Sequence, residues 1–198
     1  MTGSRSVAAV LAALLLLGVS AGPAAAAERP VPSHELFAFQ DDHIIESSGL
    51  VDRRHVVYTN NDSGDGAYVY GVDPTSGRTI SRTTYADSVT DVEAIAPGAG
   101  GTIWAGDIGD NRANRHDIAV YRMAPRDGEH PGTKYPLTYP DGPHDAETLL
   151  VQPRTQRVFV VSKAVFGGTV YAAPRQAFQS GGQRVRPVQD ERDFVCNV

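Results

Sequence analysis

Three short acidic phrases recur along the chain: Glu46–Leu50, Asp91–Ile95 and Asp145–Leu149. Each phrase has an acid, a second acid or a hydroxyl two residues later, then a small residue and an aliphatic one. Side chains two positions apart on a β-strand point to the same face, so the two acids of a phrase form a pair. Carboxylates brought together raise one another's pKa unless a cation neutralises them. The phrases therefore predict a cation site. Its candidate ligands are Glu46, Asp91, Glu93, Asp145 and Glu147.

Calcium is the cation we expect at such a site, because it accepts six to eight oxygen ligands in a flexible geometry and serves extracellular proteins. A second interpretation needs no ion. Each acid would then cap backbone N–H groups at the start of a repeated unit, and this role would recur from unit to unit equally well. The sequence leaves both interpretations open.

A second phrase follows the first two acidic ones, at Asn61–Asp65 and Gly106–Asp110. The distance from Glu46 to Asp62 equals the distance from Asp91 to Asp107, 16 positions. These loops offer further oxygen ligands without the spacing of an EF-hand, and Asx-turns explain them without an ion. The candidate loop ligands are Asp62, Asp65, Asp107, Asp110 and Asn111. The third unit has Lys163 at this place, which we expect to pair with an acid of a neighbouring unit or to meet an anionic substrate.

The elements that must position these acids are short strands. Runs rich in β-branched and aromatic residues alternate with turns rich in Gly, Pro, Asn and Asp, and Asp73–Gly77 predicts a hairpin turn. The predicted strands are His55–Thr59, Ala67–Val72, Thr79–Thr83, Thr102–Ala105, Ile118–Met123, Arg157–Ser162 and Thr169–Ala172.

The spacing of the phrases predicts a repeat architecture. The acidic phrases start 45 and then 54 positions apart, and the blades of a β-propeller take about 40–50 residues each. We therefore predict an all-β fold, an incomplete β-propeller of three to four blades from a longer, truncated array. The alternative is a small β-sandwich whose last strand is Phe194–Val198.

The two ends of the chain and its net charge limit the range of possible functions. Residues 1–27 combine a charged start, an apolar run and an Ala-rich exit, which predicts a signal peptide and a secreted protein with no membrane span after cleavage. We expect the blades in residues 28–174 and an irregular tail in 175–198. The net charge is −5, and an acidic surface argues against nucleic acid as a partner. Cys196 is the single cysteine, so no internal disulfide can form.

The acidic and loop phrases resemble those of secreted actinobacterial propeller proteins of largely unassigned function. More distantly, they are similar to the esterase-like phytase-type and gluconolactonase-type calcium-dependent propellers. The resemblance spans roughly residues 34–174 and implies a propeller fold outside the cell. In the distant relatives, acids at the inner ends of blades hold a divalent metal near the central axis. The matching positions in this chain are Glu46, Asp91, Glu93, Asp145 and Glu147.

Two functions follow as expectations. The first is a secreted propeller scaffold that binds a small molecule or an extracellular protein, with structural calcium. The alternative is a metal-dependent hydrolase of lactone or phosphate esters, in which the metal activates water. His144, beside Asp145, is a candidate general base, and a plain turn residue is the other interpretation of it.

Overall fold

The computed structural model describes residues 31–174, 183–184 and 186–187. The chain divides into two units, Met1–His34 and Glu35–Val198, and the strands found among the described residues lie in the second. The predicted signal peptide, Cys196 and the strand proposed at Phe194–Val198 are outside the described residues. Among the residues that are described, no helix is long and apolar enough to cross a membrane.

The prediction of an all-β fold is confirmed. The described residues form strands and one short 3-10 turn at Ala99–Gly101, and no α-helix occurs among them. The strands are β1 (Ser47–Arg53), β2 (Val56–Asn61), β3 (Tyr68–Val72), β4 (Thr79–Thr84), β5 (Val92–Pro97), β6 (Ile103–Asp107), β7 (Ile118–Met123), β8 (Gly128–Glu129), β9 (Thr133–Thr138), β10 (Ala146–Val151), β11 (Val158–Ser162), β12 (Val170–Ala172), β13 (Gln183–Arg184) and β14 (Arg186–Pro187).

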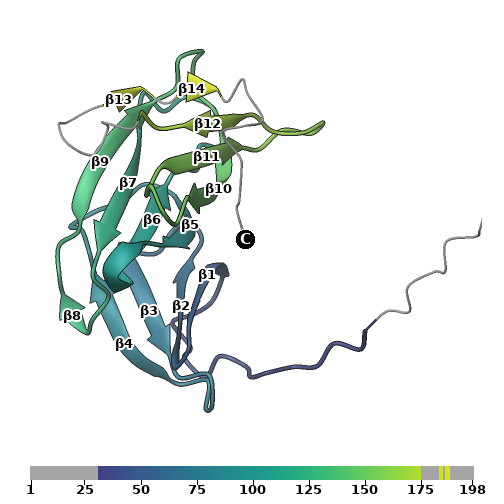
Figure 1. The fold of residues 1–198 in the computed structure, drawn as a ribbon, viewed down its shortest axis with the longest axis vertical. Helices are drawn as coiled ribbons and strands as arrows, with labels where there is room; N and C mark the ends of the chain where they lie inside the picture. The colour runs from purple at the N-terminus through teal and green to yellow at the C-terminus, as the bar shows by residue number, and fades with distance from the viewer. Residues whose placement is uncertain (1–30, 175–182, 185, 188–198) are drawn as a thin grey trace, which may run out of the picture. The chain divides into compact units, whose positions relative to one another are not determined.

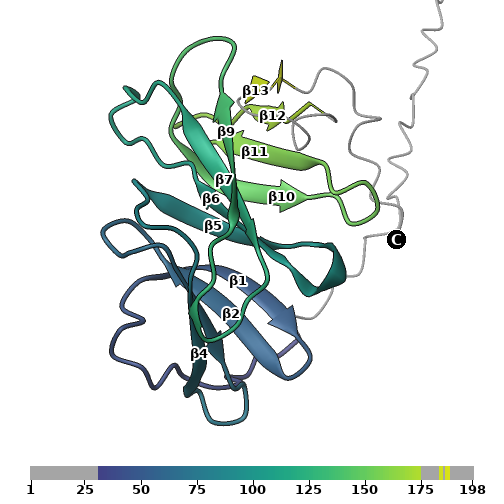
Figure 2. The ribbon, with the colours of Figure 1, turned by 90° about the vertical axis from the view of Figure 1, so that its left-hand side faces the viewer.

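The strands form three sheets, which we call the first, second and third in chain order. Their strand orders are β1-β2-β3-β4-β8, then β13-β9-β7-β6-β5, then β10-β11-β12-β14. Long neighbouring strands pair antiparallel, and only the two-residue strands β8 and β13 pair parallel. The second sheet lies between the other two (Figure 2). The first strands of the sheets, β1, β5 and β10, lie next to one another because β5 packs against both of the others (Figure 1).

Two hydrophobic layers hold the sheets together. One joins the first and second sheets and includes Val69, Ile103 and Ala105. The other joins the second and third sheets and includes Trp104 and Val160. Neighbouring residues of β6 face opposite layers because side chains alternate along a strand. The second sheet is therefore covered on both faces, whereas the three sheets do not close into a ring within the described residues.

Most of the predicted strands lie within one or two residues of the observed ones, and β7 matches at both ends. The predicted hairpin turn is also confirmed, because the Asp73 carbonyl accepts the Gly77 N–H at 2.8 Å and Gly77 takes a φ of +72°. Trp104 is 1 % exposed and packs in the layer between the second and third sheets. A tyrosine-containing strand is third in each sheet (β3, β7 and β12), and β4 and β9 lie outside β3 and β7.

The equal spacing of 16 positions does not mark structurally equivalent residues. Ser47 pairs with Asn61 and Val92 pairs with Asp107, so Asn61, not Asp62, corresponds to Asp107. The difference arises in the turn that follows the first strand of each sheet. This turn has two residues between Arg53 and Val56 in the first sheet, and it is longer between Pro97 and Ile103 in the second. Turns vary in length while the paired strands keep their register.

Candidate metal centre

Five carboxylates converge where β1, β5 and β10 begin. They form two groups in which the ligand atoms lie within 4.8 Å of one another, and Glu93 belongs to both groups. We call them the first group, which contains Asp62, Asp91 and Glu93, and the second group, which contains Glu93, Asp145 and Glu147. Four of these five residues belong to the acidic phrases, and Asp62 comes from a loop phrase.

A bulge at the same place in the second and third sheets positions the second acid of the phrase. The strand register shifts between Val92 and Ala94 in the second sheet, and between Ala146 and Thr148 in the third. Glu93 and Glu147 are the extra residues at these shifts. A bulge bends the strand and turns a side chain to a new direction, so it brings the second acid of each phrase toward the first.

Glu93 is the most deeply buried member of the cluster. Its residue is 3 % exposed, and its Oε2 is buried without a hydrogen-bond partner among the described residues. Burial, a hydrogen bond with Asp62 and the nearby charges of Asp62, Glu147 and Asp91 raise the pKa of Glu93 to about 8. A buried carboxylate oxygen without a hydrogen-bond partner is costly unless the group is protonated or meets a cation. The Glu93 side chain is therefore suited to a metal ion.

Asp91 has a related environment. Burial and then the charge of Asp62 raise the pKa of Asp91 above its ordinary value, while the Arg115 guanidinium opposes the shift. Its Oδ1 is also buried without a hydrogen-bond partner. Gly109 permits this packing, because a Cβ atom there would overlap the carboxylates of both Asp91 and Glu93. The absence of a side chain at Gly109 thus leaves room for the two carboxylates to lie close together.

Glu46 does not join either group. It is exposed, and its backbone N–H donates to Asn61 Oδ1 at 3.1 Å. Ser48 takes the place in the first sheet that Glu93 takes in the second, and its hydroxyl donates to the Glu93 carbonyl at 2.6 Å. The first sheet contributes Asp62 to the cluster instead.

The other loop candidates have different surroundings. Asp107 accepts the Asp91 N–H at 2.9 Å and pairs with Arg115, and it is 3 % exposed. Asp110 accepts the Arg115 N–H at 2.8 Å. Asp65 accepts from the Asn61 side chain, the Tyr70 hydroxyl and the Gly66 N–H. Asn111 is exposed. These contacts fix the loops, and neither carboxylate group includes these four residues.

Lys163 pairs with acids of its own sheet, whereas we expected an acid of a neighbouring unit. Its Nζ lies 2.5 Å from Glu147 Oε1 and 3.9 Å from Asp145 Oδ2. Asp145 has a second contact, because its Oδ1 accepts the Asp110 N–H at 2.7 Å. The second group is thus partly neutralised by an ammonium.

The sequence did not predict a cluster of Tyr139, Asp141, His144 and Tyr171. The Tyr171 hydroxyl donates to Asp141 Oδ2 at 3.0 Å, and His144 Nε2 lies 3.0 Å from Asp141 Oδ1 and 2.8 Å from the Tyr171 hydroxyl. Burial alone would raise the pKa of Asp141, but the hydrogen bonds from His144 and Tyr171 outweigh it and lower this pKa. The cluster anchors the loop that leads into Asp145.

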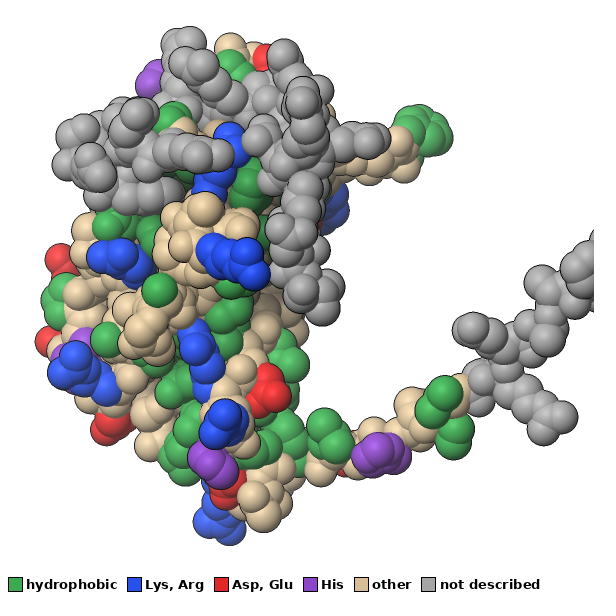
Figure 3. Space-filling view, in the orientation of Figure 1, with side chains coloured by type: hydrophobic (Ala, Val, Ile, Leu, Met, Phe, Trp, Pro, Cys, Tyr) green, Lys and Arg blue, Asp and Glu red, His purple; other side chains and the backbone are tan. Residues whose placement is uncertain are grey.

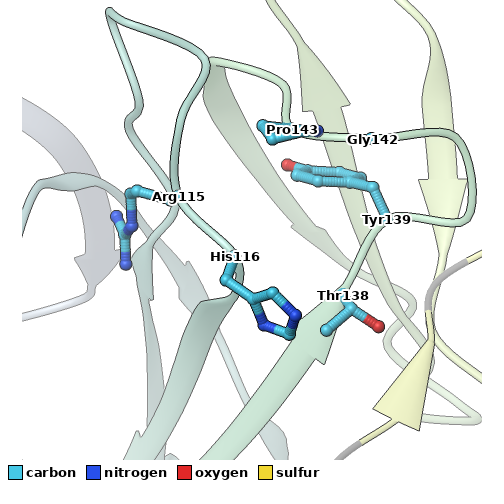
Figure 4. Close-up of a pocket in the computed structure, with 6 residues that line it drawn as sticks. All are labelled: Arg115, His116, Thr138, Tyr139, Gly142 and Pro143. Atoms are coloured by element: carbon cyan, nitrogen blue, oxygen red, sulfur yellow. The ribbon is translucent and has the colours of Figure 1, made fainter.

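A cavity of about 210 Å³ lies beside this loop (Figure 4). Arg115 and His116 line it from the segment before β7, Thr138 and Tyr139 from the end of β9, and Gly142 and Pro143 from the following loop. The six lining residues include no carboxylate. The Tyr139 hydroxyl is buried without a partner among the described residues. This cavity is therefore separate from the two carboxylate groups.

The acidic side chains visible on one face of the molecule do not gather into one large acidic surface. On the face drawn in Figure 3, Asp and Glu side chains show only as small separate patches, and Lys and Arg are scattered over it.

No protein-family model matches the chain, and no curated protein matches it in sequence. The carboxylate cluster itself, which offers oxygen ligands from all three sheets, is what can hold a metal ion.

Proposed function

We propose that this protein is a secreted β-propeller scaffold that binds one calcium ion at the carboxylate cluster and uses that ion to hold its sheets together. The single observation that carries the proposal is the Glu93 carboxylate. It is 3 % exposed, and its Oε2 has no hydrogen-bond partner among the described residues. It also lies beside four further acids. A divalent cation stabilises such a group at neutral pH.

The propeller part of the proposal rests on the repeated sheet. Apart from the two-residue parallel strands β8 and β13, each sheet is an antiparallel meander with an acidic phrase at the start of its first strand, and β5 packs against both β1 and β10. Radial repetition of four-stranded meanders around an axis is the architecture of a propeller. The ligands would come from the inner ends of successive blades, so one ion would contact several blades.

The choice of calcium rests on ligand chemistry. The cluster offers carboxylate oxygens alone, with no His or Cys in either group. Hard oxygen ligands in a flexible arrangement favour calcium over zinc or copper. A structural ion of this kind binds the folded state and not the unfolded chain, so it raises stability by mass action.

The test is a calcium titration of the purified, chelator-treated protein, followed by thermal unfolding. We expect the melting temperature to rise with calcium, because a ligand at 100 times its Kd adds about 2.7 kcal/mol of stability. Glu93→Gln should lose the rise, while Asp52→Asn, which changes an exposed acid of β1, should keep it. An unchanged melting temperature at millimolar calcium would overturn the proposal.

The same preparation tests the alternative enzyme. A structural ion predicts a chelator-induced fall in melting temperature with no turnover to lose. Chelator-sensitive hydrolysis of a lactone or a phosphate ester would instead identify the metal-dependent hydrolase.

Secretion is proposed from the signal-peptide pattern of residues 1–27. Mass spectrometry of the protein recovered from a culture medium should find Glu28 at its N-terminus. Recovery of only the uncleaved chain inside the cells would contradict this part of the proposal.

A further inference from the structure

Lys163 lies at a position that recurs in all three sheets. The backbone N–H groups of Asp62, Ile108 and Lys163 donate to the carbonyl oxygens of Glu46, Asp91 and Asp145, at 2.9, 3.0 and 2.8 Å. Each of these carbonyls belongs to the first acid of an acidic phrase. The position is therefore equivalent in the three sheets, and it holds an acid in the first, an apolar residue in the second and a base in the third.

The side chain of Lys163 reaches the second group of carboxylates. Its Nζ contacts Glu147 at 2.5 Å and lies 3.9 Å from Asp145, and these are two of the three members of that group. A lysine ammonium is ordinarily charged at neutral pH, so it acts as a cation within the group.

The first group has no such ammonium. Among the described residues, no ion pair involves Asp62, Asp91 or Glu93, whereas both remaining acids of the second group pair with Lys163. The two groups share Glu93, which has a buried oxygen without a hydrogen-bond partner. One half of the cluster is thus open to a cation, and the other half already holds one from the protein.

We infer that Lys163 is a built-in counter-ion that takes the place of a second divalent cation. This rests on the proposed calcium site. Calcium binds at Asp62, Asp91 and Glu93, and the Lys163 ammonium keeps a second ion from Glu93, Asp145 and Glu147. Without the ammonium, a second calcium ion binds there and shares Glu93 with the first, as carboxylates do in two-metal sites with ions about 3.5–4 Å apart.

The charges of the cluster agree with this inference. Five ionised carboxylates carry −5, and Lys163 and one calcium ion supply +3, which leaves −2. Replacing the ammonium with a second calcium ion supplies +4 and leaves −1. The ammonium already occupies Glu147 Oε1, so a second ion that uses this oxygen as a ligand must displace it.

The experiment measures the number of calcium ions bound per chain by equilibrium dialysis of the chelator-treated protein. We expect one ion for the wild type and two for Lys163→Met, which keeps the length of the side chain and removes its charge. Lys163→Arg and Lys134→Met should each bind one ion, because the first keeps a cation in the cluster and the second changes an exposed lysine that lies over the Tyr121 ring. Lys163 is 56 % exposed, so we expect the variant to fold.

The outcomes separate the two proposals. One ion for both the wild type and Lys163→Met would overturn the inference about Lys163 and leave the calcium site standing. Two ions for the wild type would also overturn it, since the ammonium would exclude nothing. No ion for the wild type would overturn the calcium site itself and the inference with it. The double variant Lys163→Met, Glu147→Gln should return to one ion, which locates the second ion at Glu147.

Discussion

Arg115 donates to Asp107 across 2.9 Å, from Nη1 to Oδ1, in a pair whose side chains are only 14 % and 4 % exposed. The same guanidinium donates to the carbonyl oxygens of Gly109 and Asp107. Asp107 in turn accepts the N–H of Asp91, at the start of the acidic strand β5. The ion pair therefore connects the loop after β6 to the backbone of a proposed calcium ligand.

Arg115→Met should destabilise the protein strongly. It would leave the buried Asp107 carboxylate without its counter-charge, and loss of one partner of a buried pair costs about 3–5 kcal/mol. Urea unfolding in the presence of a chelator measures this loss apart from any effect on calcium. The matched control is Arg112→Met in the same loop, where the side chain is exposed and the expected change is within about 0.5 kcal/mol. Equal stabilities of the two variants would contradict the structural role of Arg115.

The pKa of Glu93 predicts a fall in stability as pH rises. The pKa is about 8 in the folded protein, above an ordinary value of 4.5, so the folded state holds an extra proton between these values. The stabilising contribution of Glu93 is fully present below about pH 4.5. It declines as pH rises from about 4.5 to about 8, and it stays constant above about pH 8. Urea unfolding between pH 5 and 9 in chelator should show this decline, and Glu93→Gln should reduce it.

Two comparisons sharpen the pH experiment. Glu129→Gln changes an exposed acid on β8 and should keep the wild-type dependence on pH. Calcium should reverse the sign for the wild type, because the metal binds only the deprotonated carboxylate and its affinity therefore rises with pH. A Glu93→Gln variant with the same pH dependence as the wild type in chelator would show that Glu93 is already ionised in the folded protein.

Local sequence patterns were sufficient to predict seven of the strands and the all-β fold. Short β-branched runs and the turn at Asp73–Gly77 each act within a few residues, so the sequence shows them directly. The acidic phrases lie at the starts of the first strands, β1, β5 and β10. The equivalence of Asp62 and Asp107 was wrong for a physical reason: the turns between paired strands differ in length, and equal spacing along the chain does not keep register.

The contacts that define the candidate site could not be predicted in this way, because they join residues far apart in the chain. The packing of β5 against β1 and β10 decides that Asp62 joins Asp91 and that Glu46 does not. Tyr171 meets Asp141 across 30 positions. Nothing in the local sequence around either residue indicates that partner. The space at Gly109 has meaning only once the two carboxylates beside it are known.

Tyr171→Phe should loosen the loop that leads into Asp145. The change removes the hydroxyl that contacts Asp141 at 3.0 Å and His144 at 2.8 Å while keeping the buried ring. We expect a loss of about 1–2 kcal/mol in the free energy of unfolding. A double-mutant cycle with Asp141→Asn measures the interaction itself, because contacting residues give a non-additive result. Additive losses would show that the two side chains do not interact in solution.

Gly109→Ala should weaken calcium binding in a protein that keeps its fold. The added Cβ would overlap the carboxylates of Asp91 and Glu93, which must move apart, and these are two of the three ligands of the first group. We expect calcium affinity to fall at least about tenfold, since each 1.4 kcal/mol of lost binding is a factor of ten. Gly106→Ala is the matched control on β6, because its Cβ would meet the flexible end of Ile108 at 3.2 Å and no carboxylate. Calorimetric titration of both variants measures the affinities. Wild-type affinity in Gly109→Ala would mean that calcium does not need Asp91 and Glu93 at their observed separation.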